Sequence, residues 1–513
     1  MSQSKPATFL LLLPLLAALG CSTTESAPGT PAPSDPLPGL RAVPDPENVG
    51  RIVDARGREV LLRGVNFNTH VEYWQYDPER FTSYPFTEED ADLMAAMGWT
   101  MARVLMSWSR VEPEPGVYDD AYLDEVAESV AKLAERGIYS LIDLHQDAWN
   151  VSLAAPADEV CTGDTRPAGG WDGAPEWATF DNGEARCDGG QRELVPAVQA
   201  AWESFFDNVE GPGGVGIRTR YAQMFGHVVA RFATNDAVAG FDVMNEPNAF
   251  DIGQDVQLVE LYEDCLAEMR AAEASVGAPK RLFFFEPSIA WNGIGLPAPP
   301  PFEHDDQVVY APHIYQGGID PGTLEEGFMR AAQDSVERYK GAPVVTTEWG
   351  SNPPRAADPE DDYFERHLDE QDNYLFGATM WTWHTACGDP HTYNQYRDGL
   401  IPQVWGFFEM NCEDNTIEGM RTELLEVIKK MTVRFAPGAL TEVDWAKDDS
   451  ELSASGENAG GGNRLEVFVP TDDPDSVTVE STGLGPVESV PWFGGTLFYA
   501  NAAGGAWSIH LTR

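Results

Sequence analysis

Two glutamates, Glu246 and Glu348, have a setting suited to acid–base chemistry. Each follows a short apolar run that is typical of a buried β-strand, Gly240–Met244 for the first and Pro343–Thr347 for the second. A carboxylate at such a strand end can be held rigidly and partly desolvated. Hydrolysis of a glycosidic bond needs two carboxylates facing one sugar, because one gives and takes a proton while the other attacks or activates water. The pair therefore predicts glycosidase chemistry.

The elements that would position these glutamates alternate between strand and helix. Eight apolar runs separated by amphipathic helical stretches predict an α/β fold, a (β/α)8 TIM barrel over residues 50–435. A doubly wound open sheet is the alternative, but no glycine-rich phosphate loop follows the first strand. The expected strands are Val60–Val65, Met101–Leu105, Ile138–Leu144, Gly240–Met244, Arg281–Phe285, Gln307–Ala311, Pro343–Thr347 and Gly377–Trp381.

Polar and aromatic side chains lie in or after nearly every expected strand. A TIM barrel builds its active site from the carboxyl ends of its strands, so these side chains should meet at one rim. The set suits sugar binding better than a single acidic strand end would. In chain order it comprises Asn66, His70, Arg103, Ser107, Trp108, Asp143, His145, Asp147, Asn245, Glu246, Glu286, His313, Tyr315, Glu348, Trp381 and Trp383.

Two regions flank or interrupt the expected barrel. A segment from about residue 148 to 215 follows the third strand and is rich in Gly, Asp and Trp. Loops this long in compact domains are often functional, and we expect an ordered binding lid in which Trp177 either contacts substrate or packs in the core. Residues 436–513 contain short alternating runs with Gly, Asn and Pro between them, which predict a C-terminal antiparallel β-sandwich. It could bind carbohydrate, but we favour a rigid appendage on the barrel.

The N-terminus carries a targeting signal. An apolar run from Phe9 to Leu19, too short to span a bilayer well, reads as a signal peptide over residues 1–21. Ala17–Cys21 is similar to a bacterial lipobox, in which the cysteine is lipidated, and residues 22–49 form a proline-rich linker. We expect the protein to be secreted or lipid-anchored at the bacterial cell surface, plain secretion being the alternative to the anchor.

Charge and cysteine content exclude several classes of function. The net charge of −50 disfavours nucleic-acid binding and electrostatic docking on anionic membranes. No metal-type Cys/His spacing is present in the sequence, and we expect neither a metal nor a cofactor. We expect a monomer. In an exported protein Cys161 with Cys187, and Cys387 with Cys412, are candidate disulfides, although sequence alone does not fix their connectivity.

The strand-end motifs resemble those of a known family. Asn245-Glu246-Pro247 with Glu348 about a hundred residues later, together with Arg103, His145 and Trp381, resembles glycoside hydrolase family 5. Within it, Leu141–Asp147, Asp242–Pro247 and Thr347–Gly350 look most like the endoglycoceramidases, which the appended β-sandwich also fits. The resemblance implies cleavage of the β-linkage between the oligosaccharide and ceramide of a glycosphingolipid.

The resemblance also implies a role for each residue. Glu348 would be the nucleophile and Glu246 the acid/base of a retaining reaction, and the charge of Glu348 would help keep Glu246 protonated near neutrality. Substrate-binding roles would fall to Arg103 and Tyr315, which orient Glu348; to Asn245, on the sugar 2-hydroxyl; and to His145, Asp147 and Trp381, around the first sugar. In the family pattern a lysine follows the first strand and contacts the glycan. Here Asn68 or His70 takes that place. The substrate can therefore be a glycolipid in which either glucose or galactose is attached to ceramide.

Ceramide must be drawn from a micelle or a bilayer, so this function implies peripheral membrane contact and an apolar channel near the acid/base. The expected lining is Trp177, Trp202, Phe205, Phe206 and the segment 294–301. One rival function is a β-1,4-glucanase or mannanase of the same family, with an open aromatic groove. Another is a non-catalytic glycan-binding surface lipoprotein, which would not need both glutamates.

Overall fold

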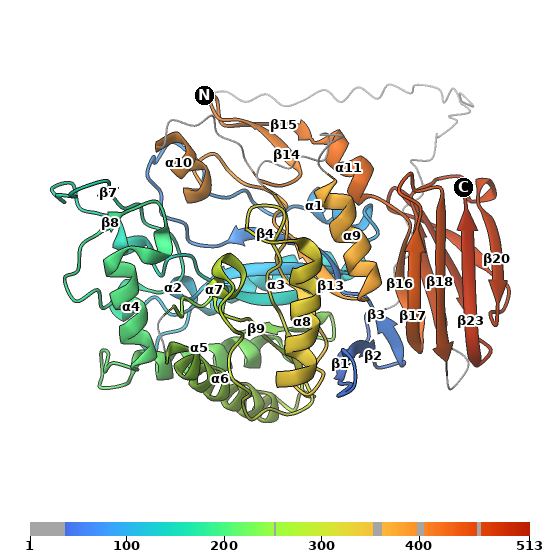
Figure 1. The fold of residues 1–513 in the computed structure, drawn as a ribbon, viewed down its shortest axis with the longest axis horizontal. Helices are drawn as coiled ribbons and strands as arrows, with labels where there is room; N and C mark the ends of the chain where they lie inside the picture. The colour runs from blue at the N-terminus through green and yellow to red at the C-terminus, as the bar shows by residue number, and fades with distance from the viewer. Residues whose placement is uncertain (1–35, 251–252, 352–361, 398–404, 459–462) are drawn as a thin grey trace, which may run out of the picture.

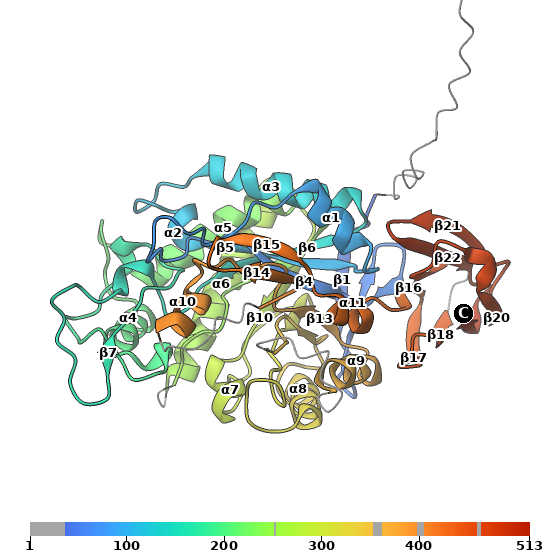
Figure 2. The same cartoon turned by 90° about the horizontal axis from the view of Figure 1, so that it is seen from above.

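A computed structural model describes residues 36–250, 253–351, 362–397, 405–458 and 463–513. The expected signal peptide and lipobox, and residues 22–35 of the linker, lie outside these ranges. Figures 1 and 2 show a large α/β body that carries a smaller all-β unit at one side. No helix in the described part of the chain is both long and apolar enough to cross a lipid bilayer.

The α/β body is built on eight parallel strands, which confirms the predicted (β/α)8 barrel. Their order around the sheet is β11-β10-β9-β6-β5-β4-β13-β12. A parallel bridge between Tyr310 and Val344 brings the two outermost strands together and closes the ring. The strands are β4 (Arg63–His70), β5 (Met101–Ser107), β6 (Tyr139–His145), β9 (Val238–Asp242), β10 (Leu282–Phe285), β11 (Val308–Tyr310), β12 (Val345–Thr346) and β13 (Gly377–Met380).

Amphipathic helices surround the strands (Figure 1). In α3 the side chain of Asp119 caps the first turn, and a stripe that includes Leu123, Val126, Val130 and Leu133 is fully buried. The larger helices are α1 (Glu88–Ala95), α3 (Asp120–Glu135), α4 (Pro196–Phe206), α5 (Ile217–Phe232), α6 (Gln254–Val276), α8 (Leu324–Arg338) and α9 (Tyr363–Asn373). Shorter ones are α2 (Trp108–Val111), α7 (Ile289–Ile294), α10 (Pro390–Arg397) and α11 (Thr422–Ile428).

The smaller unit is an antiparallel β-sandwich, as the alternating C-terminal runs predict. One sheet has the order β17 (Ala439–Trp445), β18 (Glu451–Asn458), β23 (Gly505–Thr512) and β20 (Thr478–Thr482). The other combines the C-terminal strands β16 (Thr432–Pro437), β19 (Arg464–Val469), β22 (Gly495–Asn501) and β21 (Glu488–Trp492) with three strands from the start of the described chain. These are β1 (Leu40–Val43), β2 (Arg51–Asp54) and β3 (Arg58–Val60). The two ends of the chain therefore share one sheet beside the barrel.

The insertion after β6 is ordered and lies over one side of the barrel mouth. It contains α4, three short 3-10 turns and a small hairpin of β7 (Arg166–Pro167) and β8 (Cys187–Asp188). A disulfide between Cys161 and Cys187 ties this hairpin to the loop before it, and a second disulfide joins Cys387 to Cys412. Cys265 is a free, buried cysteine on α6. A further hairpin, β14 (Phe408–Asn411) and β15 (Thr416–Met420), precedes α11.

Candidate active site

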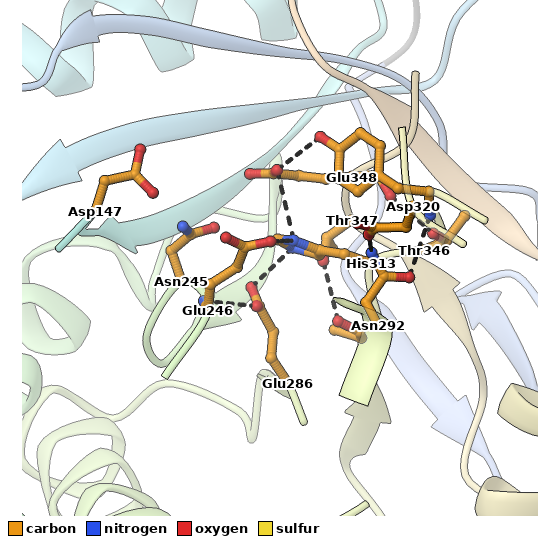
Figure 3. Close-up of polar contacts among 12 residues, drawn as sticks. Asp147, Asn245, Glu246, Glu286, Asn292, His313, Asp320, Thr346, Thr347 and Glu348 are labelled. Carbon is orange, nitrogen blue, oxygen red and sulfur yellow. Dashed lines mark hydrogen bonds and ion pairs between the residues drawn. The ribbon is translucent and has the colours of Figure 1, made fainter. Parts of the chain in front are cut away.

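A cavity of about 1000 Å³ opens at the carboxyl ends of the barrel strands. Both glutamates line it, and Figure 3 shows them on either side of His313. Its other polar and aromatic lining includes His145, Asp147, Trp171, Arg192, Asn245, Asn292, Tyr315, Asp320, Trp381, His391 and Trp405. Seven of the sixteen residues in the predicted strand-end set line this cavity: His145, Asp147, Asn245, Glu246, Tyr315, Glu348 and Trp381.

Glu246 is fixed by its backbone as well as by its side chain. It follows β9 with a φ of 38°, a left-handed conformation that is costly for a residue with a side chain. Its N–H donates to Glu286 Oε2 at 2.8 Å, and its carbonyl oxygen accepts from the amide of Gln146 at 3.0 Å. These bonds hold the turn that aims Glu246 into the cavity, where its Oε1 lies 2.8 Å from His313 Nδ1.

Glu348 follows β12 and is held at both carboxylate oxygens. Arg103 Nη1 donates to Oε1 at 2.8 Å, and the Tyr315 hydroxyl donates to Oε2 at 2.9 Å. Burial raises the pKa of Glu348, while the positive charges of His313 and Arg103 act in the opposite direction. One oxygen of Glu246 and one of Glu348 lie within 4.8 Å of each other. Retaining glycosidases separate their two carboxyl groups by about 5–5.5 Å, whereas inverting ones need about 6.5–9.5 Å.

Arg103 is the electrostatic centre of the barrel. Its guanidinium is fully buried and ion-pairs with four carboxylates at 2.8–3.0 Å, those of Asp143, Asp242, Glu286 and Glu348. Burial alone would lower the pKa of Arg103, but these carboxylates raise it well above its usual value. Burial and the charge of Glu286 raise the pKa of Asp242, so this carboxyl holds a proton more readily than usual.

His313 links the two glutamates. It belongs to the predicted strand-end set, but no role in binding or catalysis was predicted for it. Its Nδ1 lies 2.8 Å from Glu246 and 3.5 Å from Glu348, and its Nε2 lies 3.2 Å from Glu286. Burial would lower the pKa of His313, but Glu286, Glu348 and Glu246 raise it well above the usual value. A protonated imidazole cannot ligate a metal, because metal ligands must be deprotonated. A metal bound by Glu246, His313 and Glu348 would therefore have to displace this proton.

His145 and Trp381 form one wall of the cavity. Their rings are stacked, with centroids 5.4 Å apart and planes 12° from parallel. His145 Nδ1 lies 2.8 Å from Asp143 Oδ2. Burial would lower the pKa of His145, but this hydrogen bond and the charge of Asp143 raise it to about 9. The cationic ring can donate to a sugar hydroxyl, while the indole offers a flat apolar face.

Asp147 lies in a second polar cluster that depends on the insertion. Arg192 Nη2 lies 2.7 Å from Asp147 Oδ1, and His391 Nε2 lies 3.3 Å from its Oδ2. Arg192 also packs over Trp171 at 4.2 Å and reaches within 3.9 Å of Glu246 Oε2. Arg192 and His391 were not predicted, because Arg192 lies in a 3-10 turn of the insertion and His391 in α10, both outside the strand ends.

Two predicted site residues lie away from this cavity. His70 is directed toward α3, where its Nε2 lies 3.0 Å from the Ser129 hydroxyl, and burial lowers its pKa to about 4. The β4–β5 pairing changes register between Phe67 and His70, and such an irregularity redirects the side chains that follow it. Trp177 donates through Nε1 to the Glu112 carbonyl oxygen and packs edge-on against Trp108. Both residues serve packing.

The apolar part of the cavity differs from the expected lining. Trp202, Phe205 and Phe206 are buried in the core, because α4 packs its apolar face against α5 and α6. The exposed apolar residues of the cavity are instead Leu194, Ile294 and Ile319, with exposed fractions of 53%, 67% and 50%. Ile294 lies in the expected segment 294–301. The adjacent strands β9, β10 and β11 are followed by apolar lining residues: Phe250 after β9, Ile289 and Ile294 after β10, and Ile319 after β11. The clusters around Asp147 and Trp381 follow β6 and β13. Exposed isoleucines therefore gather after β10 and β11, beside Asn292 and Asp320, whereas Leu194 comes from the insertion.

Comparison with known proteins identifies a matching family and several relatives. Glycosyl hydrolase family 5, described as cellulase, matches residues 53–386. A crystal structure of an endogalactoceramidase is 32% identical, with a TM-score of 0.82 over 93% of this chain and 100% of that chain. The endo-glycoceramidase II from Rhodococcus sp., in complex with ganglioside GM3, is 23% identical with a TM-score of 0.69 over 90% of this chain and 98% of that chain, and supports the fold.

Among curated proteins, endoglycoceramidase I of Rhodococcus hoagii (strain 103S) is 27% identical over 339 residues. This alignment covers 59% of the present chain and 62% of that relative, so the chain spans less than two thirds of the relative's length.

Proposed function

The chain belongs to glycosyl hydrolase family 5, and on this premise we propose that it is a retaining endo-β-glycosidase acting on glycosphingolipids. It would cleave the bond between oligosaccharide and ceramide and release the intact glycan. One observation carries the proposal: Glu246 and Glu348 lie within reach of one bond, between a polar wall suited to sugar and exposed isoleucines suited to lipid. The similarity to an endogalactoceramidase and to endoglycoceramidases supports it.

In the first step Glu348 attacks the anomeric carbon and displaces the ceramide oxygen, which Glu246 protonates. Arg103 and Tyr315 each bond to a different oxygen of Glu348 and fix the carboxylate's orientation, which leaves a lone pair on each oxygen for attack, and Arg103 favours the ionised form. His313 holds Oε1 of Glu246, so Oε2 is the atom that faces the leaving group. In the second step Glu246 removes a proton from water, which attacks the glycosyl-enzyme and restores the original anomer.

The sugar next to the cleaved bond would lie against Trp381, with hydroxyls on His145, Asp147 and Asn245. Asn245 accepts from Arg103 Nη2 at 3.0 Å and donates to the Gln146 carbonyl, which fixes its orientation toward the sugar 2-hydroxyl. We propose that this first sugar is galactose. The similarity to an endogalactoceramidase supports this choice.

Ceramide would leave the cavity past Ile294 and Ile319, whose exposure also suits peripheral contact with a micelle or a bilayer. Hydrophobic insertion has to drive that contact, since the net charge of −50 opposes attraction to anionic lipid. We propose a monomer that works in this way.

Residence outside the cell is also proposed, as a secreted or lipid-anchored protein at the bacterial surface. The apolar N-terminal run and Cys21 in the sequence, and two disulfides in the structure, support it. In a bacterial host, detergent-phase partitioning that is lost in Cys21→Ser would support the anchor. Equal partitioning of the two proteins would contradict it.

A substrate panel read by product mass tests the proposed function. The full chain is incubated in detergent with galactosylceramide, lactosylceramide, a ganglioside and a soluble β-glucan. Release of intact glycan and ceramide is the expected result, with the galactose-first lipid turned over fastest. Cleavage of the glucan alone would identify a polysaccharide hydrolase, and glycan binding without cleavage would identify a binding protein. Either outcome would overturn the proposal.

A further inference from the structure

A second cavity, of about 190 Å³, lies at the opposite end of the barrel from the glutamates. Gly137, which lines it, precedes β6, whereas His145 of the active site ends the same strand. Most of its wall comes from β3, β16, β19, β21 and β22, the sheet that both ends of the chain build together. Figure 1 shows β3 and β16 where the barrel meets the β-sandwich.

This second cavity is positively charged in a strongly acidic protein. Four arginines line it, Arg56, Arg58, Arg434 and Arg464, and the lining contains one carboxylate, Glu466. Arg58 and Arg464 both ion-pair with Glu466, and Arg58 also pairs with the buried Asp54. The four arginines of the lining thus outnumber these two carboxylates. The chain as a whole has a net charge of −50, so a cluster of arginines differs from the rest of the protein surface.

Arg434 has hydrogen-bonding capacity that the described residues do not use. Only 2% of its surface is exposed, and its Nη2 donates to the Gly137 carbonyl oxygen at 2.8 Å. Nε and Nη1 are buried and have no acceptor within the described part of the chain. Burial lowers the pKa of Arg434 to about 10, which still leaves it charged at neutral pH. Leaving two buried donors of a charged group without acceptors is costly, so the site is suited to an anionic acceptor from outside.

Trp492 supplies a flat apolar wall next to this guanidinium. Its ring centroid lies 4.9 Å from Arg434 Cζ, and its buried Nε1 also has no acceptor among the described residues. Leu37, Leu497 and Tyr499 add further apolar and aromatic surface. A cavity of about 150 Å³ admits a six-membered ring, so this one has room for a ring as well as an anionic group. Guanidinium groups bind carboxylate and phosphate oxygens in pairs.

We propose that this cavity binds a small sugar acid or sugar phosphate, with its oxyanion on Arg434 and its ring against Trp492. The ligand class combines the two chemistries that the wall presents, an anion site and a flat aromatic face. The site is separate from the glutamates, and the proposal stands whether or not the enzyme cleaves glycolipids.

Isothermal titration of the full chain tests the ligand class. The probes are glucuronate, glucose 6-phosphate, neutral glucose and inorganic phosphate. We expect one equivalent of glucuronate or glucose 6-phosphate to bind at least tenfold more tightly than glucose and than inorganic phosphate, and the tighter of the two distinguishes carboxylate from phosphate. Inorganic phosphate binding as tightly as either sugar, or no binding by any anion, would overturn the proposal.

Variants locate the bound ligand. Arg464→Gln and Arg434→Gln should each weaken binding at least tenfold. Arg464 is 37% exposed, so its replacement should be tolerated even if the loss of Arg434 prevents folding. The matched control is Arg231→Gln, because Arg231 is 38% exposed and pairs with Asp124 on the barrel helices. Undiminished binding in a folded Arg464→Gln protein would place the ligand elsewhere and refute the assignment.

Discussion

Arg192 Nη2 lies 2.7 Å from Asp147 Oδ1, although the two residues are 45 positions apart and belong to different parts of the fold. Asp147 follows barrel strand β6, whereas Arg192 lies within the insertion, shortly before α4. The same guanidinium nitrogen is 3.9 Å from Glu246 Oε2. One cation from the insertion therefore joins the sugar-binding wall to the proposed acid/base.

This relationship predicts that Arg192 contributes to catalysis from outside the barrel. In Arg192→Ala, Asp147 loses one ion-pair partner and keeps His391 at 3.3 Å, so the cost of about 3–5 kcal/mol for breaking a fully buried pair is an upper bound. We expect kcat/KM on the glycolipid to fall at least tenfold, with partial recovery in Arg192→Lys. Steady-state kinetics on the three proteins measures it.

The control for this prediction is Arg186→Ala, because Arg186 pairs with Asp181 in the same insertion but does not line the cavity. A comparable loss in both alanine variants would mean that the insertion had merely been loosened.

Replacing Glu246 and replacing Glu348 should have different effects on the two chemical steps. Glu246→Ala removes the proton donor, so kcat/KM on a glycolipid should fall by about 10²–10⁴-fold. With a 2,4-dinitrophenyl β-galactoside, whose leaving group needs no proton, the glycosyl-enzyme should still form and accumulate. Glu348→Gln should form no glycosyl-enzyme from either substrate. Intact-protein mass spectrometry detects the covalent species.

Thermal melts of both variants provide the folding control. A glycosyl-enzyme in Glu348→Gln, or near-normal turnover in Glu246→Ala, would reassign these residues.

The exposed isoleucines of the cavity should matter for lipid and not for soluble substrates. Burying an isoleucine side chain against ceramide is worth about 1.5–3 kcal/mol. Ile294→Asp and Ile319→Asp should therefore each raise KM for glycolipid in micelles about tenfold or more. Hydrolysis of an aryl β-galactoside should stay near the wild-type rate, because its leaving group does not extend that far.

Val256→Asp, on α6, is the matched control, since Val256 is 52% exposed and lies outside the cavity lining. Equal losses on the lipid and the aryl substrate would indicate a distorted site rather than a lost lipid contact.

The raised pKa of His145 makes part of the stability pH-dependent. Folded His145 holds its proton up to a pKa of about 9, whereas the unfolded chain releases it near 6.5. The stabilisation that this proton provides is complete below pH 6.5 and is lost as the pH rises through about 9. The slope of the unfolding free energy against pH over this range should thus be less negative in His145→Gln than in the wild type. One proton contributes at most about 1.4 kcal/mol per pH unit.

Urea unfolding at several pH values gives both slopes. Below pH 6 the two slopes should coincide, since His145 is protonated in both states there. Parallel slopes between pH 6.5 and 9 would show that the folded protein does not retain this proton.

The barrel and the centre of its site could be predicted from the sequence. Each of the eight apolar runs contributes a barrel strand, and Arg103, Asn245, Glu246, Tyr315 and Glu348 meet at one rim. The prediction works because parallel strands present their carboxyl ends at the same end of a barrel. A residue at a strand end is therefore located by topology, without knowledge of its neighbours.

The orientation of single side chains was less predictable. His70 lies at a strand end as expected, yet the register change after Phe67 directs it to α3. Trp177 lies in the ordered insertion as expected, yet it fills a gap between Trp108 and Glu112. Both outcomes depend on local packing, which sequence period does not encode.

The sequence by itself determined the strand ends, and with them the two glutamates and the residues that orient them. Only the tertiary structure decided that Arg192 and His391 meet Asp147. It also decided that Ile294 and Ile319 give the active-site cavity exposed apolar surface, and that Arg434 lines a second cavity. The physical reason is that regular strands obey a local period that sequence displays. Contacts between loops, and between the two ends of the chain, depend on which distant surfaces pack together, and no local pattern records that choice.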